Sequence, residues 1–114
     1  MQTDTFKDKV VIVTGGASGI GRCIADEFRK QGAVVYVIDK QEGDHFVGDI
    51  ARQEVLEAFA AEVLGQHARV DVIVNNALPL MRGIDECSYE EFQYALSVGV
   101  TAPFYLVKLL KNHL

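Results

Sequence analysis

The fold is decided by the stretch Val10-Val11-Ile12-Val13-Thr14-Gly15-Gly16-Ala17-Ser18-Gly19-Ile20-Gly21, an apolar run that leads through a glycine-rich turn into a helix-patterned segment. The β-branched run predicts a parallel strand that is buried on both faces. Glycines allow a tight turn and let a ligand approach the backbone closely. The N–H groups that begin the following helix point at the same place, where they and the helix dipole favour an anion. The stretch therefore predicts a site for a pyrophosphate.

A carboxylate follows at the spacing that dinucleotide binding requires. Asp39 ends the next apolar run, Val34–Ile38, and lies 18 residues after Gly21. An acidic residue roughly 20 residues beyond the glycine turn is placed to accept the ribose hydroxyls of a dinucleotide. A glycine triplet alone is also compatible with a purely structural turn, but the strand, the helix and the acid together favour a dinucleotide site.

The apolar pattern along the whole chain predicts the order β-α-β-β-α-β-α. The expected strands are Lys9–Thr14, Val34–Ile38, His45–Gly48 and Val70–Asn75. The expected helices run from about Gly19 to Gln31, from about Arg52 to Leu64, and from Ser88 to about Asn112, the last one bent at Gly99 and Pro103. Right-handed crossovers then give an α/β fold, a Rossmann-like doubly wound parallel sheet in the strand order 3-2-1-4. The ligand crevice is expected at the carboxyl ends of these strands.

Several side chains have expected places in these helices. Ile20, Ile24 and Phe28 share one face of the first helix, which indicates packing on the sheet. Cys23 is expected in the core, as a small residue where this helix approaches the first strand. Ser88 and Glu91 have the spacing of a capping box at the start of the last helix.

The glycine spacing resembles that of the short-chain dehydrogenase/reductase family, because Thr14 is followed by G-x-x-x-G-x-G. Asn75-Asn76-Ala77 resembles the family's N-N-A-G, although Leu78 replaces its last glycine. Gly48-Asp49-Ile50 resembles the D-[VI] that follows the third strand, and Val98–Phe104 resembles a helical V-N-x-x-[GA]-x-F stretch. The resemblance runs from about Lys9 to Leu114 and covers the first half of the family's usual length.

The resemblance implies an NAD-dependent oxidoreductase that transfers hydride between a nicotinamide and an alcohol or ketone. Residues 1–114 are then expected to form a single NAD(P)-binding domain that is incomplete, because the family's catalytic Ser and Tyr-x-x-x-Lys lie beyond it. The 114-residue chain alone is therefore expected to be inactive. Two alternatives stay open: a non-catalytic NAD-binding or sensing module, and a subunit that pairs with a separate catalytic chain.

No catalytic residue is identified within the chain. Gly99 stands where the family has an Asn whose carbonyl takes part in a proton relay. Tyr36 and Lys40 fit Y-x-x-x-K, but on a strand this spacing separates them by roughly 13 Å, against roughly 6 Å on a helix. Tyr36 is therefore predicted to be an ordinary strand residue.

The residues expected to bind the cofactor are Gly15, Ser18, Gly19, Ile20, Gly21, Asp39, Asp49, Ile50, Asn76 and Ala77. The glycines shape the turn, the region of Ser18 and Ile20 supplies donors to the pyrophosphate, and Thr14 is expected to brace the turn against the end of the fourth strand. Asp39 accepts the ribose hydroxyls and repels a 2′-phosphate, so NAD is favoured over NADP, although Lys40 beside it weakens that preference. The resemblance implies that Asp49 contacts the adenine amino group, that Ile50 packs on the ring, and that Asn76 and Ala77 line the adenosine side. A helix cap is the alternative role of Asp49.

Composition narrows the class of protein. A formal net charge of −5 argues against nucleic acid as a partner, and the hydrophobic content of 49% with 24% charged residues is that of a globular protein. His45, His67, His113 and the two cysteines show no metal-binding pattern. The chain has no long apolar run, and residues 1–5 lack the order of a signal peptide, so no membrane partner and a cytoplasmic location are expected. A homo-oligomer is also expected, because the fourth strand presents an apolar edge and Leu106, Val107, Leu109, Leu110 and Leu114 gather on the last helix.

Overall fold

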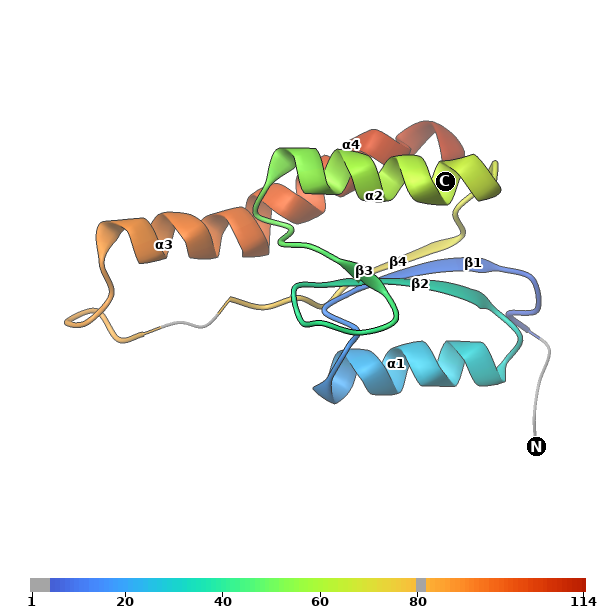
Figure 1. The fold of residues 1–114 in the computed structure, drawn as a ribbon, viewed down its shortest axis with the longest axis horizontal. Helices are drawn as coiled ribbons and strands as arrows, with labels where there is room; N and C mark the ends of the chain where they lie inside the picture. Colours follow the sequence, from blue (N-terminus) through green and yellow to red (C-terminus); the bar gives the residue numbers. More distant parts are fainter. Residues whose placement is uncertain (1–4, 80–81) are drawn as a thin grey trace.

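A four-stranded parallel sheet in the order β3-β2-β1-β4 forms the centre of the molecule (Figure 1). The structure is a computed structural model that describes residues 5–79 and 82–114. The expectation that residues 1–5 do not form a signal peptide therefore lies, for residues 1–4, outside the described part. The strands are β1 (Val10–Thr14), β2 (Val34–Asp39), β3 (Phe46–Val47) and β4 (Val72–Asn75). The predicted fold class and strand order are confirmed.

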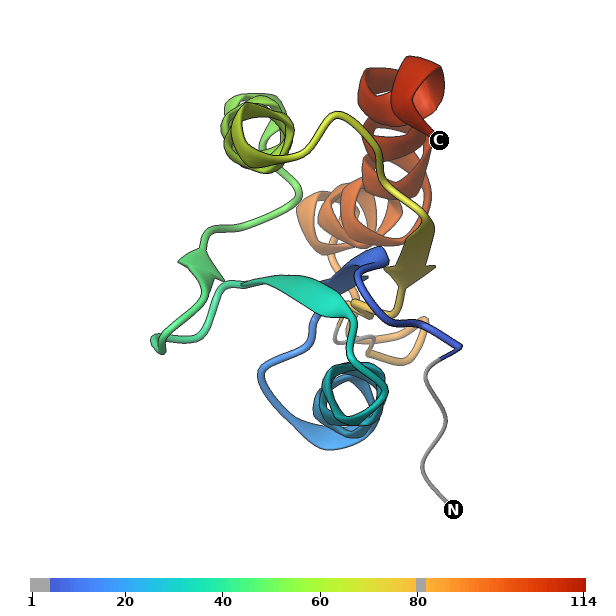
Figure 2. The same ribbon diagram turned by 90° about the vertical axis from the view of Figure 1, so that its right-hand side faces the viewer.

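Helices cover both faces of the sheet (Figures 1 and 2). Helix α1 (Gly19–Lys30) packs on one face through a cluster around Val11, Val13 and Ala25. Helices α2 (Gln53–Gln66) and α4 (Ala102–Leu110) pack side by side on the other face, over a larger cluster that includes Ile12, Phe59 and Leu106. Every residue of β1 is buried, as its β-branched composition predicts.

The register brings three strand ends together. Thr14, the last residue of β1, pairs with Ile38 of β2 on one side and with Asn75 of β4 on the other. The loops that follow these strands therefore leave the sheet at one edge, which is the edge where the crevice is expected.

The last helical region is not one regular helix. Helix α3 (Tyr89–Leu96) is followed by a π-helical turn at Ser97–Thr101, then by α4 and a short 3₁₀ turn at Lys111–His113. The predicted bend at Gly99 thus takes the form of a wider turn, and Pro103 lies in the first turn of α4 just after it. Proline has no N–H, so a helical carbonyl before it lacks its usual donor. A wider turn accommodates such a carbonyl.

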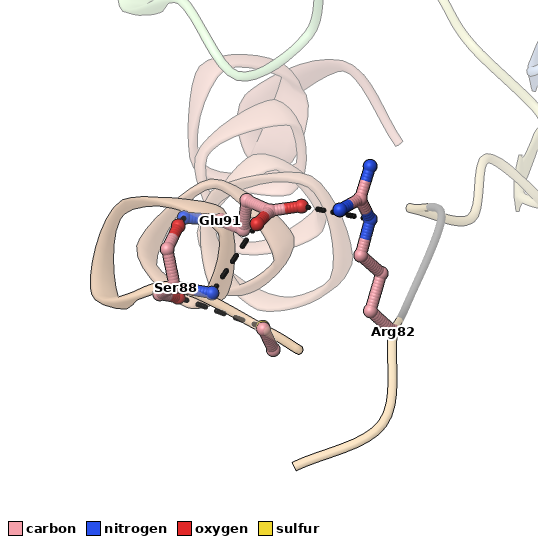
Figure 3. A network of polar contacts seen from close by, with 4 residues as sticks. Arg82, Ser88 and Glu91 are labelled. Carbon is pink, nitrogen blue, oxygen red and sulfur yellow. Dashed lines mark hydrogen bonds and ion pairs between the residues drawn. The ribbon is translucent and has the colours of Figure 1, made fainter. Parts of the chain in front are cut away.

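The capping box at the start of α3 is confirmed (Figure 3). The N–H of Glu91 donates to the Ser88 hydroxyl at 3.1 Å, and the N–H of Ser88 donates to the Glu91 carboxylate at 3.2 Å. Arg82 pairs with the same carboxylate at 3.3 Å. The Ser88 N–H above all, together with the Arg82 cation, holds the pKa of Glu91 below its ordinary value.

Cys23, Leu106 and Leu110 do not pack as expected. Cys23 is exposed, because the small residues that face the sheet from α1 are Gly21 and Ala25, one turn apart. Leu106 and Leu110 are 1% and 0% exposed, since they pack in the core and do not belong to the apolar surface of the last helix.

Strand β4 begins later than expected because its first residues have other partners. The N–H of Val70 donates to the carbonyl of His113 at 2.9 Å, and the carboxylate of Asp71 accepts from the N–H of Val10 at 2.8 Å. The regular ladder therefore starts at Val72.

Candidate nucleotide-binding cleft

A cleft of about 510 Å³ opens at the carboxyl ends of the strands. Its walls come from the turn after β1, the end of β2, the segment before α2, the segment after β4, and the junction between α3 and the π-helical turn. Nine of the ten residues predicted to bind a cofactor line it, and Gly19 is the exception. The nine are Gly15, Ser18, Ile20, Gly21, Asp39, Asp49, Ile50, Asn76 and Ala77.

The glycine turn is fixed to the end of β4 by Thr14 and Asn76. The hydroxyl oxygen of Thr14 accepts from the N–H groups of Asn76 and Ala77, at 3.1 Å each. In return the side-chain amide of Asn76 donates to the carbonyls of Thr14, at 3.2 Å, and Gly15, at 3.0 Å. The predicted bracing role of Thr14 agrees with these contacts, and Asn76 shares it while also lining the cleft.

Two glycines of the turn are required by close contacts. A Cβ on Gly15 would lie 2.9 Å from Cα of Ala77, and the φ of Gly15 is 67°. A Cβ on Gly21 would run into the carbonyl of Gly15 and the side-chain amide of Asn76. The turn therefore accepts no side chain at these positions without moving.

The start of α1 is left open toward the cleft. No side chain caps this helix at Ser18, and no acidic residue lies in its first turn. The first N–H groups of a helix have no partner within it, so they are available to an anion. Ile20 is 75% exposed at this place; it lines the cleft, and its expected packing with Ile24 and Phe28 is wrong.

Asp39 is held at the rim by backbone donors. One carboxylate oxygen accepts from the N–H of Ala17 at 3.0 Å, and the other accepts from the N–H of Gln41 at 3.0 Å. Each oxygen keeps a second lone pair, so the carboxylate can still accept from a ligand hydroxyl. The same carboxylate thus ties the glycine turn to β2 and lines the cleft.

Asp49 makes contacts that the sequence did not predict. One carboxylate oxygen accepts from the N–H of Ala51 at 3.0 Å, and the other accepts from the hydroxyl of Tyr94 at 2.7 Å. The N-cap position of α2 is Arg52, whose side chain makes no capping bond, so the alternative role of Asp49 as the capping residue does not apply.

Tyr94 and Lys40 line the cleft together with Asp49. The ammonium of Lys40 lies 5.6 Å from the centre of the Tyr94 ring. Burial, and then the bond to Asp49, raise the pKa of Tyr94 to about 12. Sequence analysis missed Tyr94; the one available signal was its place one helical turn before the buried Val98, on the same face.

Tyr36 and Lys40 point to different partners. The Tyr36 hydroxyl donates to the side chain of Gln66 at 2.9 Å, while Lys40 lies over Tyr94. Burial raises the pKa of Tyr36, the opposite of what a catalytic phenol needs. The prediction that Tyr36 is an ordinary strand residue agrees with its place in β2.

Within residues 5–79 and 82–114, no group of His, Cys, Asp and Glu is arranged to hold a metal ion. Among the helices of these residues, none combines the length and the apolar character needed to cross a bilayer.

Comparison with known proteins gives a consistent result. Residues 9–114 match the family model described as short chain dehydrogenase. L-fucose dehydrogenase of Mus musculus is 33% identical over 96% of this chain and 45% of its own length. The chain spans about half the length of the curated relatives that it matches.

Solved structures agree with this fold. A 3-ketoacyl-(acyl-carrier-protein) reductase of Brucella melitensis complexed with NADH has a TM-score of 0.85 and 27% identity, over 96% of this chain and 51% of that one. L-sorbose reductase of Gluconobacter frateurii complexed with NADPH and L-sorbose has a TM-score of 0.86 and 26% identity, over 95% of this chain and 48% of that one.

Proposed function

We propose, from the premise that this chain belongs to the short-chain dehydrogenase family, that it binds NAD in the cleft between the glycine turn and Tyr94. The observation that supports this most is the convergence of nine predicted residues on one cleft, above a helix start that no side chain caps. We further propose that residues 1–114 act as one nucleotide-binding domain.

The residues of the cleft fit a dinucleotide. The open N–H groups at Ser18–Gly21 suit the pyrophosphate, and Gly15 and Gly21 keep the backbone close to it. Asp39 suits the ribose hydroxyls, and Asp49 with Ile50 suits the adenine base. Asn76 and Ala77, which follow β4, line the same cleft and suit the adenosine side of the ligand.

We propose NAD as the preferred cofactor. Asp39 carries a negative charge at the place where the extra phosphate of NADP would lie, which disfavours NADP by repulsion. Lys40 opposes this effect only in part, because its ammonium lies over the Tyr94 ring.

For the whole protein we propose hydride transfer between the nicotinamide and an alcohol or ketone. A bound nicotinamide supplies the hydride acceptor or donor, and the residues described here bind and orient it. A binding-only role uses the same cleft, and an assay of hydride transfer distinguishes the two roles. We also propose that the protein associates with itself through its exposed apolar surface.

Calorimetry with NAD, NADP and ADP-ribose tests the proposed binding. We expect NAD to bind more tightly than NADP, and Asp39→Ala to reduce that preference. Glu42→Ala is the matched control, because Glu42 is an exposed acid of the same loop that does not line the cleft. Tighter binding of NADP than of NAD contradicts the role given to Asp39, and no binding of any of the three contradicts the proposed function.

A further inference from the structure

Tyr94 connects two parts of the chain that are far apart in sequence. It lies in the last turn of α3, and its hydroxyl donates to Asp49 in the segment before α2 at 2.7 Å. The other oxygen of Asp49 is held by the N–H of Ala51 at 3.0 Å. Each carboxylate oxygen therefore has one donor, and the two donors together fix how the carboxylate is turned.

The strand order indicates which part of a dinucleotide meets Asp49. The pyrophosphate belongs at the turn after β1, and the ribose belongs at Asp39, which ends β2. Strand β3 is the next strand outward from β2, and Asp49 follows it closely. The base of the nucleotide therefore lies at the end of the cleft that Asp49, Ile50 and Tyr94 line.

A carboxylate at this place distinguishes purines by the group at their C6 atom. Adenine carries an amino group there, which donates to a carboxylate, whereas a 6-oxopurine carries a carbonyl oxygen, which a carboxylate repels. This discrimination requires that the carboxylate keeps a fixed orientation, because an acceptor that turns away neither binds the amino group nor repels the carbonyl.

We propose that Tyr94 is a positioning residue that sets the base specificity of the cleft, by holding Asp49 in the orientation that accepts the amino group of adenine and rejects a 6-oxopurine. The inference rests on the proposed function, since it concerns the same cleft. A tyrosine hydroxyl is protonated at neutral pH, and burial with the bond to Asp49 raises the pKa of Tyr94 further, so this hydroxyl stays a donor throughout the neutral range.

A role in packing alone is the competing explanation, because the ring of Tyr94 also carries the ammonium of Lys40 at 5.6 Å. The two roles depend on different parts of the Tyr94 side chain, the hydroxyl for positioning and the ring for packing. Tyr94→Phe keeps the ring and removes the hydroxyl, so it tests the hydrogen bond to Asp49 and leaves the contact with Lys40.

The experiment compares NAD with nicotinamide hypoxanthine dinucleotide, in which a carbonyl replaces the adenine amino group, by calorimetry on the protein. We expect the wild type to prefer NAD, and Tyr94→Phe to lower that preference roughly three- to tenfold, chiefly by weaker binding of NAD. In an Asp49→Ala background the same substitution should change nothing further. Tyr89→Phe, an identical change at an exposed position of α3, should leave both affinities as they are.

The outcomes separate the two proposals. Wild-type protein that binds neither dinucleotide contradicts the proposed function. Wild-type protein that binds both dinucleotides equally overturns the role of Tyr94. The same conclusion follows if Tyr94→Phe keeps the preference for NAD, or if it loses affinity for both dinucleotides alike. In each of these cases dinucleotide binding stands. Circular dichroism verifies that each variant is folded, and Tyr94→Leu serves as a second variant that should lower the preference by a similar factor.

Discussion

Thr14 and Asn76 hold each other across the carboxyl ends of β1 and β4. The N–H of Asn76 donates to the Thr14 hydroxyl at 3.1 Å, and the side-chain amide of Asn76 donates to the Thr14 carbonyl at 3.2 Å. Thr14 is 2% exposed, so water does not replace these bonds if one partner is removed. The shape of the glycine turn thus depends on a residue that precedes it.

Thr14→Val should therefore lower the free energy of unfolding by about 1–3 kcal/mol, because it leaves the N–H of Ala77 without its acceptor and the N–H of Asn76 with only the carbonyl of Val74. Thr14→Ser keeps the hydroxyl and should cost less. Urea unfolding of both variants measures the difference. Equal stability of the valine and serine variants would show that the hydroxyl is not what matters.

Gly21→Ala should destabilise the protein and weaken dinucleotide binding, because the new Cβ meets the Gly15 carbonyl and the Asn76 amide. Gly65→Ala is the matched control. Gly65 lies in α2 with nothing within 4 Å of an added Cβ, so alanine there should stabilise the helix by about 0.5–1 kcal/mol. Thermal unfolding of the two variants should show shifts of opposite sign.

The sequence predicted the sheet order and most of the cleft because these features depend on local patterns. A β-branched run, a glycine turn and an acid at a set spacing determine β1, α1 and the place of Asp39. Cys23 was misplaced because a shift of one position along a helix moves a side chain between core and solvent. With the small residues Gly21 and Ala25 on either side of it, periodicity does not show which small residue faces the sheet. Tyr94 was missed because its bond to Asp49 joins segments 45 residues apart, and no local pattern records such a contact.

The burial of Tyr94, and then its hydrogen bond to Asp49, predict a pH dependence of stability. The pKa of Tyr94 is about 12 in the folded protein and has its ordinary value of 10.0 when unfolded, so the folded state binds this proton more tightly. The contribution is complete below pH 10 and is lost as the pH rises through 12. The stability difference between wild type and Tyr94→Phe should therefore be constant below pH 10 and shrink above it, as measured by urea unfolding over a pH series. A stability difference between the two proteins that does not change with pH contradicts the raised pKa of Tyr94 in the folded state.

The 114-residue chain should show no dehydrogenase turnover with NAD and a broad set of alcohols. In its Tyr-x-x-x-Lys match, Tyr36 lies on β2 and Lys40 directly after it. Tyr36 bonds to Gln66 and Lys40 lies over Tyr94, so the pair delivers no proton to a substrate in the cleft. Absorbance of NADH measures the rate against a blank without protein. Turnover that survives repurification and is lost in Tyr36→Phe would overturn this expectation.

An apolar stripe runs along the outer face of the last helical region. It consists of Phe92, Leu96, Val100 and Phe104, which are spaced by four residues and are 49%, 40%, 62% and 64% exposed. Strand β4 adds an apolar strand edge to this stripe, because among the described residues β4 pairs with β1 alone and ends the sheet. Exposed surfaces and strand edges of this kind promote association.

We therefore expect the protein to form a dimer or larger assemblies as its concentration rises. Val100→Glu and Phe104→Glu should weaken this association with little loss of stability, because both side chains already face solvent and a buried charge arises only in the assembly. Glu90→Gln, at an exposed position of α3 outside the stripe, is the control for a changed surface charge. Sedimentation over a dilution series measures the masses. A wild type that stays monomeric at high concentration, with the amide protons of β4 slow to exchange, would mean that another part of the chain protects this edge and that the stripe is no interface.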